Sequence, residues 1–153
     1  MTKEKVKACV DAALAMLFAR DAFLLEHGTG ERAIVAKLAA YMAPLFRGFD
    51  VDVEYNRQGL DPRASKALTL GPECRGGGRK KVYPDIIVHR RGVLRQHNLL
   101  VVEVKRRSNT EPRSCDRAKI DAMKAEYKYR FGVLIDLPSG PGAGQDKAQQ
   151  EWR

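Results

Sequence analysis

Two apolar segments decide how this chain folds: VYPDIIVHRRG at residues 82–92 and LLVVEVKRR at residues 99–107. Each contains a run of valine, isoleucine or leucine about as long as one β-strand. The short connection between them contains Gly and Asn, which indicates an antiparallel hairpin. Because the runs are apolar at consecutive positions, we expect both faces of these strands to be covered. The presence of the acids Asp85 and Glu103 in such strands therefore calls for a chemical explanation.

The two acids can share one face of the predicted sheet. Alternate residues of a strand point to the same side, so Glu103 and Lys105 share a face and Val102 and Val104 share the other. Asp85 joins the side of Glu103 if the hairpin register has the right parity, which the sequence allows. The alternative that these residues have no functional role stays open, since a Glu-x-Lys pair in a strand commonly lies on a solvated face and forms a weak cross-strand ion pair.

The remaining pattern predicts an α/β chain with a mixed sheet. A segment rich in Gly, Pro and Arg, residues 58–81, is expected to be a long mobile loop, and the tail at 138–153 is expected to fray. Apolar residues at helical spacing predict three helices, at residues 3–25, 31–46 and 116–130. Alternating or apolar runs predict four strands, at residues 49–57, 82–89, 99–106 and 131–137.

The length of 153 residues fits one domain, which we place at residues 1–137. The uncharged stretches are too short for a spanning helix and the N-terminus lacks a signal-peptide core, so a cytoplasmic protein that does not bind membranes is expected. The cysteines Cys9, Cys74 and Cys115 show no metal-binding spacing and are expected to be reduced thiols.

The net charge of +9 is concentrated around the two acids. Residues 75–107 contain ten Lys or Arg but only Asp85 and Glu103 as acids, whereas residues 1–74 carry ten of each sign. Basic clusters are commonly just solvated, but this one encloses two carboxylates. Because neutralised phosphates supply most non-specific nucleic-acid affinity, the pattern favours a polyanionic partner.

Glu31 is a third acid that points towards the sheet. On a helical wheel it lies close to the apolar stripe of the helix predicted at residues 31–46. The alternative is an acid in a first helical turn that only favours the helix dipole. The strand acids Asp50, Asp52 and Glu54 alternate with apolar residues, so we expect an exposed face and keep only Glu54 as a distant candidate.

Taken together, these residues resemble the PD-(D/E)XK nuclease superfamily. The resemblance covers residues 31–137 and rests on Glu31, YPDIIVH, LLVVEVKRR and the order of elements. VDVEYNR and Asp116-x-x-Lys119 also resemble small stand-alone bacterial members. The resemblance implies a three-layer restriction-endonuclease-like core, αβββαβ around a mixed central sheet, here with an extra N-terminal helix.

The resemblance also implies the chemistry of a metal-dependent endonuclease acting on DNA. Mg²⁺ or Mn²⁺ would be held by Asp85, Glu103, the backbone carbonyl of Val104 and Glu31. Lys105 would orient or help deprotonate the attacking water and stabilise charge on phosphorus. A homodimer is compatible with cutting two strands. Two other functions stay open, a non-catalytic nucleic-acid-binding module of the same fold and an RNA-directed nuclease.

Basic side chains outside this set are expected to contact phosphates without reading sequence. Lys119 can instead be a solvated charge, and His89, which shares a face with Asp85, can simply end its strand. The expected phosphate contacts are Arg75, Arg79, Lys80, Lys81, Arg90, Arg91, Arg95, Arg106, Arg107 and Lys119.

Overall fold

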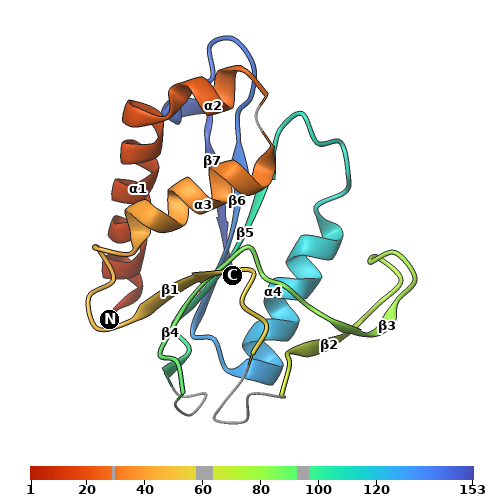
Figure 1. The fold of residues 1–153 in the computed structure, drawn as a ribbon. Coiled ribbons are helices and arrows are strands. Elements are labelled where there is room, and N and C mark those ends of the chain that lie inside the picture. The colour runs from red at the N-terminus through yellow and green to blue at the C-terminus, as the bar shows by residue number, and fades with distance from the viewer. Residues whose placement is uncertain (29, 58–63, 93–96) are drawn as a thin grey trace.

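A five-stranded mixed sheet lies at the centre of the chain, with helices on both faces (Figure 1). The computed structural model describes residues 1–28, 30–57, 64–92 and 97–153. The strand order is β1-β4-β5-β6-β7, and every neighbouring pair is antiparallel except the parallel pair β5 and β6. The strands are β1 (Asp50–Val53), β4 (Ile86–His89), β5 (Leu100–Arg106), β6 (Phe131–Leu137) and β7 (Gln149–Trp152).

One face of the sheet is covered by α1 (Lys3–Arg20), α2 (Ala22–Glu26) and α3 (Glu31–Met42). The single helix predicted at residues 3–25 is interrupted at Asp21, whose carboxylate accepts the hydroxyl of Tyr41 and pairs with Lys37. The helix predicted at residues 31–46 ends earlier because Pro44 cannot donate a helical hydrogen bond. The larger core cluster fills this layer and includes Leu14, Leu17, Ile34, Leu38, Ile86, Val88, Val102 and Val104.

The opposite face is covered by α4 (Ser114–Tyr127) and by a separate hairpin of β2 (Ala67–Leu70) and β3 (Gly78–Lys81) (Figure 1). Leu68, Ile87, Val101, Ile120 and Met123 belong to the second core cluster, which lies here. The hydroxyl of Tyr127 accepts from the Ala67 N–H at 2.8 Å and so ties α4 to the hairpin.

The prediction of a long mobile loop at residues 58–81 is wrong for its second half. Residues 58–63 lie outside the described residues, but β2 and β3 form an antiparallel ladder. The glycines at 76–78, which suggested mobility, have positive φ values between 43° and 76° and make the turn between the strands. Buried Leu68 and Leu70 anchor the hairpin on α4.

The prediction of a fraying tail is also wrong. β7 pairs with β6, in a register that places Trp152 opposite Val133 and Gln149 opposite Asp136. Trp152 packs against the larger core cluster, and Arg153 forms ion pairs with Asp121 of α4 and with Glu151. The last residues therefore form an edge strand of the sheet. No helix in the described ranges is long and apolar enough to cross a membrane.

The register of β4 and β5 confirms the antiparallel hairpin. Ile86 lies opposite Val102 and Ile87 opposite Val101, and β1 pairs antiparallel with β4 on its other side. Continued by one residue, this register sets Asp85 opposite Glu103, and opposed residues point to the same face. That face is the one covered by α4, because Ile87 and Val101 belong to its core cluster.

Cys74 and Cys115 form a disulfide, so the expectation of three reduced thiols is wrong for these two. Cys74 follows β2 and Cys115 lies in the first turn of α4, 41 positions later. Their pairing depends on the hairpin folding back onto α4, which their spacing in the sequence does not reveal. Cys9 is a free, half-buried thiol.

Removing this cross-link should lower the free energy of unfolding. A bridge that closes a loop of 41 residues restricts the unfolded chain, and its loss typically costs about 2–4 kcal/mol. Cys74→Ser with Cys115→Ser should therefore unfold at lower urea concentration, as should the reduced wild type. Cys9→Ser is the control and should change little. Equal stability of the oxidised and reduced wild type would contradict the prediction.

Candidate functional site

Asp85 and Glu103 meet where the ladder between β4 and β5 ends. β4 begins at Ile86, so Asp85 lies just outside the ladder, after a proline that has no N–H to donate. Its carboxylate Oδ2 accepts the backbone N–H of Val104 at 2.7 Å. The side chain of Glu103 is only 3% exposed. One acid thus lies just before β4 and the other, almost completely buried, in the middle of the adjacent β5.

The electrostatics of these two acids favour an added positive charge. Burial, and then the negative charge of Asp85, raise the pKa of Glu103 from 4.5 to about 8. Burial also raises the pKa of Asp85, against the opposing effects of the Val104 N–H and of Lys105. Because the charged forms are disfavoured by low solvation and mutual repulsion, a proton or a cation stabilises the pair.

Two lysines and a second buried acid, Asp116, complete what we call the carboxylate–lysine cluster: Asp85, Glu103, Lys105, Asp116 and Lys119. The Nζ of Lys119 lies 3.4 Å from Glu103 and 3.4 Å from Asp116. The Nζ of Lys105 lies 3.6 Å from Asp116. Burial alone would lower the pKa of both lysines, but the surrounding carboxylates outweigh it and raise both pKa values. Both lysines are therefore ammonium ions.

Asp116 is the member of this cluster that the predicted site residues do not include, although Asp116-x-x-Lys119 belongs to the pattern that carries the family resemblance. Arg113 precedes the helix, and Asp116 is buried in its first turn. The signal is its spacing from Lys119, because residues three apart on a helix lie on the same face. Lys119 is not a solvated charge and instead faces the buried acid Glu103.

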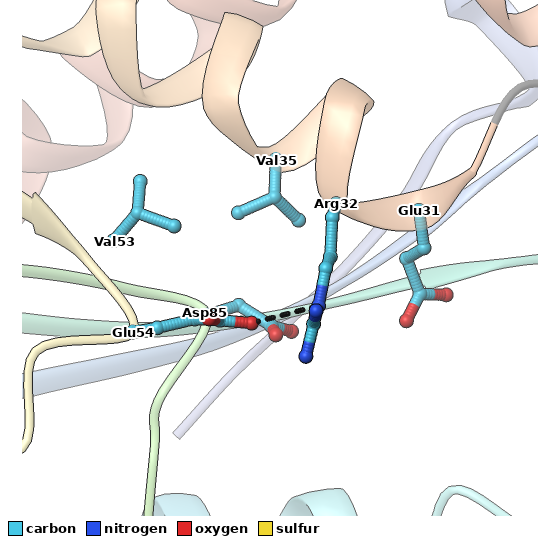
Figure 2. A pocket seen from close by; sticks show the side chains of 6 residues that line it. All are labelled: Glu31, Arg32, Val35, Val53, Glu54 and Asp85. Carbon is cyan, nitrogen blue, oxygen red and sulfur yellow. Dashed lines mark ion pairs between the residues drawn. The ribbon is translucent and has the colours of Figure 1, made fainter.

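Glu31 reaches the cluster from α3, on the other face of the sheet. Its Oε1 lies 3.5 Å from the Nζ of Lys105, and its Oε2 accepts the Arg106 N–H at 3.2 Å. The prediction that its carboxylate points towards the sheet is confirmed. Glu31 and Asp85 also line a cavity of about 190 Å³ with Arg32, Val35, Val53 and Glu54 (Figure 2).

A ready-made cage of three or more metal ligands is not present in the described part of the chain. Within residues 1–28, 30–57, 64–92 and 97–153, no group of three or more His, Cys, Asp or Glu side chains is placed to hold a metal ion. Asp85 and Glu103 are two such side chains, and the lysines Lys105 and Lys119 lie among the neighbouring acids. A cation at this pair would need waters and a backbone carbonyl as its further ligands.

The basic side chains do not all surround the carboxylates. Arg106 ends β5 and Arg107 follows it, directly after Lys105. Arg90 and Arg91 follow the other end of β4, about 17 Å along the strand from Asp85. There Arg90 donates to the carbonyl of Gly48, and Arg91 pairs with Asp52. Arg95 lies outside the described residues.

A second basic group lies on the hairpin of β2 and β3. Arg75, Arg79 and Lys81 are exposed there, and Arg79 forms an ion pair of 3.6 Å with Glu126 of α4. Lys80 donates to the carbonyl of Arg75. The hairpin is packed on α4, the helix that carries Asp116 and Lys119, so its positive charge lies on the same side of the sheet as the cluster.

His89 is not part of the cluster. Its Nε2 lies 2.8 Å from Oδ2 of Asp52, and burial lowers its pKa despite that carboxylate. The expectation of an exposed row of strand acids is wrong for Asp52, whose side chain is 13% exposed and pairs with His89 and Arg91. Glu54 is exposed, as expected, and lines the cavity beside Asp85.

Comparison with known proteins leaves the family open. No protein-family model matches the chain, and no curated protein matches it. The crystal structure of SSO0001 is similar at 14% sequence identity and a TM-score of 0.40, over 99% of this chain and 68% of that one. A likeness at that score carries no argument about function.

The buried state of Glu103 predicts how stability depends on pH. Its folded pKa of about 8 lies above the ordinary 4.5, so the folded protein holds this proton more tightly than the unfolded chain. The resulting stabilisation is present below about pH 4.5 and is lost as the pH rises through about 8. Glu103→Gln mimics the protonated form at every pH.

Urea denaturation of wild type and Glu103→Gln between pH 5 and pH 8 measures this effect. The wild type should lose stability relative to the variant by up to about 1.4 kcal/mol per pH unit. Glu111→Gln, at an exposed position, is the matched control, and its free energy of unfolding should change with pH as that of the wild type does. A difference between wild type and Glu103→Gln that stays constant with pH would contradict the assignment.

Proposed function

We propose that this protein is a metal-dependent endonuclease that hydrolyses phosphodiester bonds in DNA. We further propose that it belongs to the PD-(D/E)XK superfamily and has the restriction-endonuclease-like core. The observation that supports the proposal most is the placement of Asp85 and Glu103 on one face of adjacent strands, with Lys105 two residues further on. A binding protein has no need for two mutually repelling acids beside basic side chains.

The side chains present fit a hard divalent cation. Mg²⁺ is commonly held through one or two carboxylates while it keeps several waters. Asp85 and Glu103 therefore supply enough carboxylate ligands for such an ion. The raised pKa of each acid means that its ionised form is destabilised, so a nearby cation would stabilise it. The proposed ligands are Asp85, Glu103, the carbonyl of Val104 and, directly or through a water, Glu31. When bound, Mg²⁺ or Mn²⁺ would supply Lewis-acid stabilisation of the reacting phosphate.

The remaining groups have roles that follow from their positions. Lys105 is a protonated amine between Glu31 and Asp116, where it can hold a water and stabilise negative charge growing on phosphorus. Lys119 lies 3.4 Å from Glu103, and once a cation is bound there its ammonium would be available to a phosphate oxygen. The hairpin residues Arg79 and Lys81 would hold the nucleic-acid backbone.

Cleavage assays test the catalytic proposal. Wild type should cut supercoiled or linear DNA in Mg²⁺ and not in EDTA, with structured RNA assayed in parallel. Lys105→Ala should reduce the rate by about 10²-fold or more, because charge stabilisation in the transition state is lost. Lys5→Ala, an exposed lysine on α1, is the matched control and should retain full activity.

Two outcomes would contradict this proposal in different ways. If Lys105→Ala cuts as fast as the wild type, the cutting does not come from this cluster. If RNA alone is cut, the chemistry stands and DNA is the wrong substrate.

Binding assays distinguish an enzyme from a non-catalytic module of the same fold. Replacing Arg79, Lys80 and Lys81 with Ala should weaken binding of duplex DNA and lower the salt slope of log K by about 3, because each side chain would neutralise one phosphate. The measurement is fluorescence anisotropy in EDTA at several NaCl concentrations. If weaker binding is found while no substrate is ever cut, the non-catalytic module is the better description.

A further inference from the structure

The cavity beside Asp85 contains an ion pair that the proposed reaction does not use. Among the described residues that line it, Glu31, Glu54 and Asp85 are acids, and Arg32 carries the one positive charge. Figure 2 shows the guanidinium of Arg32 paired with Glu54, with Glu31 to one side in this view and Asp85 behind the pair. The distance from Arg32 Nε to Glu54 Oε1 is 3.1 Å.

The backbone of Glu54, the partner of Arg32, is held by hydrogen bonds. Glu54 follows β1 and has a φ of 50°, a left-handed conformation that is uncommon for a residue with a side chain. Its N–H is directed at two carbonyls of the segment before β4, that of Pro84 at 3.1 Å and that of Asp85 at 3.3 Å. The end of β1 is therefore tied directly to the segment that carries Asp85, and strain of this kind is often found at functional sites.

Arg32 itself is exposed to solvent. Its side chain is 90% exposed, whereas that of Glu54 is 43% exposed. Ion pairs between exposed side chains contribute little to stability, so this one can exchange partners at low cost. The other acids are already engaged, since Glu31 contacts Lys105 and Asp85 accepts the Val104 N–H.

We propose that Arg32 is a phosphate-binding residue of this cavity and that Glu54 holds its guanidinium until a nucleic-acid phosphate replaces the carboxylate. A planar guanidinium that pairs with a carboxylate suits a phosphate equally well, because both offer two oxygens to its fork. Without this exchange, a phosphodiester at the cavity would meet three acids. The inference rests on the proposed function, since it names the group that admits the substrate to that site.

Binding of a fluorescein-labelled 20-base-pair DNA duplex in EDTA tests the exchange without any cleavage. Arg32→Ala should weaken binding about 5- to 20-fold and lower the salt slope by about 1. Glu54→Gln should strengthen binding about 3- to 10-fold, because the competing carboxylate is gone. In the Arg32→Ala background, Glu54→Gln should change the affinity less than about twofold.

The matched control is the ion pair between Lys37 and Asp21, which also involves α3 but lies outside the cavity. Lys37→Ala removes one positive charge from the same helix and should weaken binding less than about twofold. An equal weakening in Lys37→Ala and Arg32→Ala would show a general charge effect and overturn the assignment. The assignment is also overturned if Glu54→Gln strengthens binding equally in the presence and absence of Arg32.

Cleavage measurements separate this inference from the nuclease proposal. If Glu54→Gln stops cutting in Mg²⁺ without strengthening binding, Glu54 serves the metal and the exchange is wrong. If Lys105→Ala stops cutting but Arg32→Ala binds and cuts like the wild type, the nuclease proposal stands and Arg32 is not a phosphate contact. If the Arg32 effect is found in a protein that never cuts, the phosphate site stands and the nuclease proposal fails.

Discussion

The register between β4 and β5 is the constraint on which the rest of the site depends. A shift of one residue would place Asp85 and Glu103 on opposite faces of the sheet. The hydrogen bond from the Val104 N–H to Asp85 marks the end of this ladder. The Asp85 carboxylate accepts this backbone donor, while the Pro84 carbonyl accepts the N–H of Glu54. The chemistry and the strand pairing are therefore fixed by the same residue.

Around this constraint the chain brings further acids and lysines together from three elements. β5 supplies Glu103 and Lys105, α4 supplies Asp116 and Lys119, and α3 adds Glu31 from the opposite face. Carboxylates and ammonium groups this close form a cluster in which each charge depends on its neighbours. The disulfide between Cys74 and Cys115 joins the basic hairpin to the turn of α4 that carries Asp116, so the hairpin and the cluster form one structural unit.

Much of the sheet could be predicted because strand periodicity is local. β6 begins and ends at the predicted residues. Asp85 and Glu103 share a face because side chains alternate along each strand and the hairpin has the register that the sequence allowed. What the sequence did not reveal depends on tertiary contact. Trp152 turns a polar tail into an edge strand by packing on the core, and Asp116 is buried only because α4 lies on the sheet. Asp52 alternates like a solvated acid but pairs with His89, since the strand beside it places that imidazole within reach.

Locating a divalent ion in the protein is the decisive measurement for the proposed metal site. Crystals soaked in Mn²⁺ should show an anomalous peak bound by Asp85 and Glu103, about 2 Å from their oxygens, with Lys119 moved away from Glu103. Asp85→Asn crystals should lose this peak. A saturating soak that leaves the pair of acids without a peak, with Lys119 still on Glu103, would contradict the claim that they form a metal site.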